Sequence, residues 1–183
     1  MIKLIPTAAL LLLTSSAIFA QDKAAVGFSG IYNFPLHSIG GGIRIQLPVN
    51  HRVSVVPKLK YMPAFNTIQE VYGGLSFQYN IINNTVARGT KNLVVPNRPV
   101  VYVSAGLDYN KWLNYEANLN SKAKPQNLIP EAGIGVSAGL NLVRVFAEVK
   151  YNMLWQESYG EIGFLLFPFN APSPRKNNCP YRL

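Results

Sequence analysis

The chain has 183 residues, and its single cysteine, Cys179, excludes an internal disulfide framework. Apolar and aromatic residues make up 49% of it, but after residue 20 no apolar run is long enough for a membrane-spanning helix. With 17 Lys and Arg against 8 Asp and Glu, the net charge is +9, which suits anionic partners such as lipopolysaccharide phosphates or an acidic protein.

The N-terminal 20 residues have the features of a secretory signal peptide. Lys3 supplies the basic start, residues 5–13 are apolar, and Ile18-Phe19-Ala20 offers a cleavage site before Gln21. The apolar run is shorter than the ~20 residues that a spanning helix needs. We therefore predict that residues 1–20 are removed, which leaves a net charge of +8. An exported protein has no nucleic acid to bind, so we expect no such partner.

Short segments with alternating apolar and polar residues follow the signal peptide. This period of two is typical of β-strands with one apolar face. Most of the segments approach the ~9–11 residues of a tilted transmembrane strand, whereas strands of soluble proteins are usually nearer ~5–6 residues. The predicted strands cover residues 24–33, 38–47, 52–61, 70–80, 99–109, 131–140, 143–152 and 159–169.

The charges of these segments fall on one phase of the alternation. The apolar phase, for example Val53, Val55 and Leu59, carries no charge in mid-strand. A charge that faces lipid at the bilayer midplane costs about 2–4 kcal/mol, so a membrane barrel requires this segregation. The predicted inward charges are Arg44, Lys58, Lys60, Asp108, Glu131, Arg144, Glu148, Lys150 and Glu161. In so narrow a barrel they predict an ion-pair network that fills the lumen, with a proton or ion path as the alternative.

The positions of small and aromatic residues along the segments are also typical of a membrane β-barrel. Glycine and serine are frequent on the inward phase, where they leave space for long charged side chains. Aromatic residues gather near the strand ends, as in the interfacial girdles of membrane barrels. The predicted girdle residues are Tyr61, Phe65, Tyr72, Tyr79, Tyr109, Trp112, Tyr151, Trp155, Tyr159, Phe167 and Phe169.

The connections predict an orientation. With the N-terminus in the periplasm, residues 48–51 and 141–142 are short periplasmic turns and residues 110–129 form a long outer loop. The connection 81–98 is an exception, because it is long and periplasmic; its Leu93-Val94-Val95 either extends a neighbouring strand or forms a short extra one. Candidates for contact with a periplasmic protein partner are Arg88, Lys91 and Arg98 in this connection, and Arg175, Lys176, Cys179 and Arg182 near the C-terminus.

The chain resembles small outer-membrane β-barrel proteins of the OmpX type, the transmembrane domain of OmpA and the PorT-like barrels. The resemblance covers roughly residues 24–169 and is one of architecture: a signal peptide, eight alternating segments such as Ser54 to Tyr61, and an aromatic last strand from Tyr159 to Phe169. Many such barrels end on an aromatic residue, whereas this chain continues to Leu183. The expected organisation is a signal peptide (1–20), an eight-stranded antiparallel up-and-down transmembrane β-barrel (21–170) and a disordered basic periplasmic tail (171–183).

Catalytic residues are scarce in this sequence. The histidines are His37 and His51, the aspartates are Asp22 and Asp108, and no spacing fits a catalytic triad, a metal site or a phosphate loop. We therefore predict a non-enzymatic protein without cofactors in the outer membrane of a Gram-negative cell. Its expected role is structural, or interaction through loops and tail. The alternatives are a subunit of a secretion or transport assembly and a soluble secreted β-barrel that binds an apolar ligand.

Overall fold

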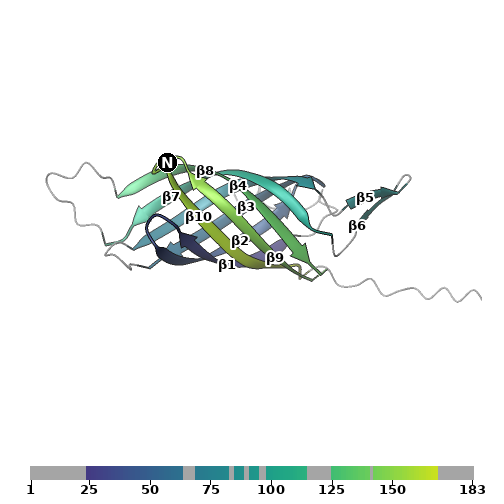
Figure 1. Ribbon diagram of the computed structural model, residues 1–183, viewed down its shortest axis with the longest axis horizontal. Helices are drawn as coiled ribbons and strands as arrows, with labels where there is room; N and C mark the ends of the chain where they lie inside the picture. The colour runs from purple at the N-terminus through teal and green to yellow at the C-terminus, as the bar shows by residue number, and fades with distance from the viewer. Residues whose placement is uncertain are drawn as a thin grey trace, which may run out of the picture.

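The computed structural model describes residues 24–63, 69–82, 85–88, 91–94, 98–114, 125–140 and 142–168. Eight of its strands form a closed barrel in the order β1-β10-β9-β8-β7-β4-β3-β2 (Figure 1). All neighbouring strands are antiparallel. The strands are β1 (Ala25–Asn33), β2 (Ser38–Pro48), β3 (Val53–Met62), β4 (Glu70–Ile82), β5 (Thr85–Arg88), β6 (Lys91–Val94), β7 (Val100–Trp112), β8 (Gln126–Gly139), β9 (Val143–Asn152) and β10 (Glu157–Leu166). This confirms the predicted eight-stranded up-and-down barrel.

The structure corrects the expected ends of several strands, among them β10, which runs from Glu157 to Leu166 and not from 159 to 169. β7 continues to Trp112, and β8 begins at Gln126 instead of residue 131. The added segment contains Pro130, and proline cannot donate to a strand ladder. In the structure, β8 pairs with both neighbours only from Glu131 onward, and residues 126–130 pair with β7 alone. Pro130 therefore lies where β8 extends beyond β9, an edge position that tolerates proline.

The connection 81–98 contains a separate hairpin. Its strands β5 and β6 pair with each other and form a two-stranded sheet apart from the barrel. Leu93 and Val94 thus belong to a short extra strand, which was one of the two expected outcomes. Figure 1 shows this hairpin beyond one end of the barrel.

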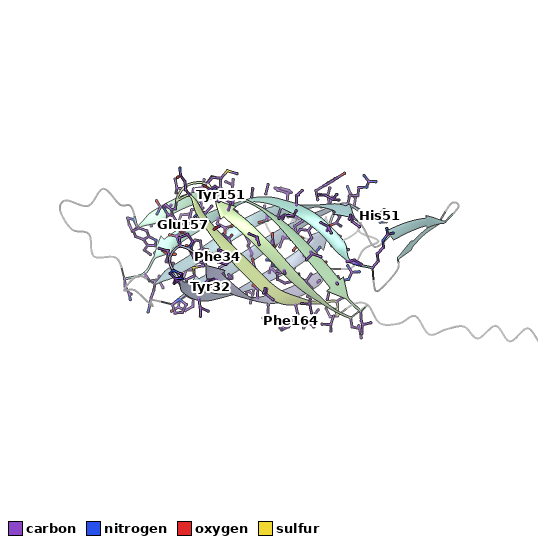
Figure 2. All side chains as sticks on the ribbon, viewed as in Figure 1. Tyr32, Phe34, His51, Tyr151, Glu157 and Phe164 are labelled. Carbon is purple, nitrogen blue, oxygen red and sulfur yellow. The ribbon has the colours of Figure 1, made fainter. Side chains whose placement is uncertain are left out.

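The two ends of the barrel differ. We call the end with the β5–β6 hairpin, the turn 49–52 and the connection 140–142 the hairpin end. The opposite end, with the turns 34–37 and 153–156 and the connections 63–69 and 113–125, is the loop end. Figure 2 shows His51 at the hairpin end, and Tyr32, Phe34 and Glu157 at the loop end.

The two faces of the barrel wall have opposite character. Outward side chains are apolar and exposed, for example Ile134 (55% exposed), Leu107 (52%) and Ile162 (66%). Inward positions of the same strands hold most of the buried polar and charged residues. Because strand side chains alternate between the two faces, each strand contributes to both. No helix in the described ranges is long and apolar enough to cross a membrane.

Two predicted segments lie outside the described residues. They are the signal peptide 1–20 and the tail 171–183, and both stay predictions.

Candidate functional site

Charged side chains from all around the barrel meet in its interior, because each occupies the inward phase of its strand. They are Arg44 on β2, Lys58 and Lys60 on β3, Asp108 on β7, Glu131 on β8, Glu148 and Lys150 on β9, and Glu161 on β10. None of them is more than 5% exposed. Positive and negative charges are equal in number, so the interior as a whole is neutral. We call these residues the lumen network.

Arg44 joins two carboxylates. Its Nη1 lies 2.9 Å from Glu148 Oε2, and its Nη2 lies 2.5 Å from Glu161 Oε1. The guanidinium carbon lies 4.1 Å from the centre of the Phe146 ring, which adds a cation–π contact. A planar guanidinium suits this position because it presents several donors in a fixed fork, which a single ammonium cannot do.

Two lysines of β3 share a second pair of carboxylates. Lys58 Nζ lies 3.1 Å from Asp108 Oδ1 and also contacts Glu131. Lys60 Nζ lies 2.6 Å from Asp108 Oδ2 and 3.0 Å from Glu131 Oε2. Because Lys58 and Lys60 are two residues apart on one strand, both face inward. Each ammonium thus has two counter-charges, which offset the cost of removing it from water.

Lys150 connects these two groups. Its Nζ lies 3.2 Å from Glu161, 3.5 Å from Glu148 and 3.6 Å from Glu131. The ion pairs therefore form one continuous network across the barrel. Such a network holds several strands together and fills the space that a solute would need.

Hydroxyl groups donate additional hydrogen bonds to the carboxylate oxygens of the ion pairs. Ser29 donates to Glu161 at 2.6 Å, Ser104 to Glu148 at 2.5 Å and Ser76 to Glu131 at 3.3 Å, and the Tyr159 hydroxyl also donates to Glu131. These residues were not predicted as hydrogen-bond donors to the network. Their inward phase was the available signal, because it places them beside the charges.

Apolar layers close the lumen network on both sides. The loop-end layer consists of Ile31, Met62, Tyr72, Ile129 and Tyr159, with Trp155 packed against it. The hairpin-end layer consists of Ala25, Phe146 and Leu165, with Phe167 packed against it. The predicted girdle is wrong for Tyr72 and Tyr159, which are buried inside the barrel at 8% and 6% exposure. Both share the inward phase of their strands, so the alternation outweighs their place near a strand end.

A cavity of about 20 Å³ lies between the loop-end layer and the lumen network. Lys60, Asp108 and Glu131 line it on the network side, and Asn33 and Glu157 line it toward the loop end. This volume is that of about one water molecule. This cavity thus has room for one water molecule and not for a larger solute.

Arg144 lies apart from the contacts that hold the network together. It is partly exposed near the hairpin end, and its guanidinium carbon lies 5.8 Å from the centre of the Phe167 ring. Its inward phase agrees with the prediction, but its position near the start of β9 places it beside the hairpin-end layer.

The predicted partner-facing residues are only partly described. Arg88 and Lys91 lie opposite each other in the β5–β6 hairpin, and Arg98 is exposed just before β7. The other candidates, Arg175, Lys176, Cys179 and Arg182, lie outside the described residues.

The histidines and the described aspartate do not meet. His37 lies in a turn at the loop end, where its Nδ1 is 2.9 Å from the Tyr32 hydroxyl, whereas His51 lies at the hairpin end (Figure 2). Asp108 is buried in the lumen network. Among the described residues, no group of three His, Cys, Asp or Glu side chains could hold a metal ion.

The barrel is similar to solved transmembrane β-barrels. It matches the N-terminal β-barrel domain of OprF from Pseudomonas aeruginosa with a TM-score of 0.58 and 15% identity, over 80% of this chain and 97% of that one. It matches Neisserial surface protein A (NspA) with a TM-score of 0.51 and 14% identity, over 79% and 94% of the two chains. A de novo designed transmembrane β-barrel gives a TM-score of 0.51 at 16% identity, over 79% and 93%.

No family model matches the chain, and no curated protein does. The structural likenesses define its class by fold. The chain has the fold of an eight-stranded transmembrane β-barrel, and the expected architectural resemblance to outer-membrane barrels is confirmed.

Proposed function

We propose that this protein is a non-enzymatic integral barrel of the bacterial outer membrane, with a closed lumen and a structural or interaction role. The observation that carries the proposal is the distribution of residues across the wall. Exposed aliphatic side chains surround the barrel, and the ion-paired charges lie inside between two apolar layers. A wall of this kind suits lipid, because a β-barrel satisfies its backbone hydrogen bonds internally.

The same distribution argues against a soluble barrel that binds an apolar ligand. Such a protein needs an apolar cavity and a polar exterior, and this barrel has the reverse. The closed lumen likewise argues against an open pore. The placement of His37, His51 and Asp108 supports a non-enzymatic role, because catalysis by a triad needs these residue types within hydrogen-bond reach of one another.

A subunit of a secretion or transport assembly is the second candidate. The β5–β6 hairpin favours it, because the hairpin projects beyond the barrel and pairs with no barrel strand. An isolated two-stranded hairpin is marginally stable in water, so contact with a partner would stabilise it. In this role the barrel would anchor the assembly, and solutes would pass elsewhere.

Fractionation and conductance together test the proposal. We expect the protein in the outer-membrane fraction, with unboiled and boiled samples that migrate differently on a gel, as closed barrels do. In planar bilayers, purified folded protein should give no steady open-channel current. Folded protein in the soluble periplasmic extract would contradict the membrane role, and a steady single-channel current would contradict the closed lumen.

A further inference from the structure

Among the described residues, the excess of positive charge lies at one end of the barrel. The lumen network is neutral. At the loop end, the described charges are Lys111, Glu70 and Glu157, so cations are not in excess there. At the hairpin end, by contrast, the described residues include five cations and no carboxylate. They are Arg52, Arg98 and Arg144 at the rim, and Arg88 and Lys91 in the hairpin.

Part of this charge is held against the outside of the barrel wall. The Arg52 backbone oxygen accepts a hydrogen bond from Asn80 N at 2.7 Å, which ties the β2–β3 turn to β4. The Arg52 side chain donates from Nη1 to the Tyr79 hydroxyl at 3.3 Å. Tyr79 faces outward and is 45% exposed. The guanidinium of Arg52 therefore lies on the lipid side of the wall and not over the lumen.

Apolar surface lies next to this arginine. The pairing of β4 with β7 shifts between Asn80 and Ile82, and this irregularity leaves two consecutive side chains exposed, Ile81 at 58% and Ile82 at 46%. Arg98 is exposed just before β7, the strand that pairs with this part of β4. The wall of β3, β4 and β7 thus presents an apolar surface with cations at its hairpin-end margin.

We propose that this surface, formed by Arg52, Tyr79, Ile81, Ile82 and Arg98, binds an anionic phospholipid of the periplasmic leaflet. Guanidinium groups bind phosphate through paired, charge-assisted hydrogen bonds. A tyrosine is favoured at the headgroup level, and the isoleucines contact the acyl chains. The inference rests on the proposed function, because it needs a barrel in a bilayer with its hairpin end in the periplasm. An acidic protein is the competing partner, but the contact of Arg52 with the lipid-facing Tyr79 favours a lipid.

Lipid selectivity can be measured by electron paramagnetic resonance with spin-labelled lipids. The mature chain is refolded in phosphatidylcholine vesicles, and spin-labelled phosphatidylglycerol is compared with spin-labelled phosphatidylcholine in the lipid shell of the barrel. We expect a several-fold preference for phosphatidylglycerol. The preference should fall steeply with salt, because the Debye length shortens from ~10 Å at 0.1 M to ~3 Å at 1 M.

Matched variants locate the site. Arg52→Gln combined with Arg98→Gln should bring the selectivity close to one. Lys111→Gln, at the loop end, and Arg144→Gln, at the same rim but on the inward phase of β9, should keep most of it. Removal of residues 171–183 should also keep it. Heat-modifiable migration of each sample shows that the barrel is folded and inserted.

The outcomes separate this inference from the proposed function. A folded, inserted wild type without a phosphatidylglycerol preference would overturn the lipid site and leave the membrane role intact. A preference that survives the double variant, or that is lost with residues 171–183 alone, would also overturn it. Cross-linking of this rim in cells to an acidic protein in place of lipid would do the same. Failure of the wild type to insert would contradict the proposed function itself.

Discussion

A lysine on the outer wall should be far more costly in mid-strand than at the rim. Ile134 and Leu140 belong to the same outward face of β8 and its continuation, and they are 55% and 67% exposed. Ile134 pairs with Val103 and Val149 in the middle of the barrel, whereas Leu140 follows the last residue of β8. A lysine at the bilayer midplane costs about 2–4 kcal/mol, against about 0–1 kcal/mol near the interface. We therefore expect Ile134→Lys to destabilise the folded barrel by about 2–4 kcal/mol and Leu140→Lys by about 1 kcal/mol or less.

The assay is reversible unfolding in denaturant of barrels refolded into vesicles, followed by the fluorescence of Trp112 and Trp155. Both substitutions replace an exposed aliphatic residue by the same charged one, so depth in the membrane is the variable that differs. If this face were in contact with water, Ile134→Lys would be harmless. Equal stability of Ile134→Lys and the wild type, or equal losses in the two variants, would refute the assignment of this face to lipid.

Two further predictions concern the interior. Glu131→Gln removes a counter-charge from Lys58, Lys60 and Lys150 and should destabilise the barrel by about 3–5 kcal/mol in the same assay. The control Glu157→Gln, at the partly exposed loop-end rim, should cost less than about 1 kcal/mol. Similar losses in the two variants would contradict a tightly coupled network. Gly135→Ala places a methyl group 2.6 Å from the Tyr102 hydroxyl and should cost about 1–3 kcal/mol. Tyr102→Leu in the same chain should recover part of this loss, and no recovery would show that the clash lies elsewhere.

Alternation predicted which charges face inward, because side-chain direction in a strand follows a period of two whatever its neighbours are. The partners of each charge depend on how far neighbouring strands are shifted relative to one another, and the sequence of one strand does not determine this shift. Arg44, for example, is opposite Lys58 in the β2–β3 register, yet it contacts Glu148 and Glu161 from β9 and β10. The lumen charges were thus predictable as a set, and their pairing was not.

The same reasoning explains two misplaced expectations. Tyr72 and Tyr159 were assigned to the girdle from their place near strand ends, although they occupy the inward phase of their strands. In a closed barrel the phase determines which face a side chain occupies, because a residue cannot turn to the other face without a shift of the whole strand. The β5–β6 hairpin, by contrast, was one of the two outcomes expected for the connection 81–98. Gly89-Thr90 between two short extended runs was the available signal for it.

The most direct test of the account is a cysteine scan along β8, with Cys179 replaced by serine. Spin labels at residues 132, 134, 136, 137 and 138 are compared for collisions with oxygen, which concentrates in lipid, and with a water-soluble nickel complex. We predict high oxygen accessibility at 132, 134, 136 and 138, and low accessibility to both reagents at 137. High nickel accessibility at 134 and 136 would place this face in water and contradict a membrane-embedded barrel.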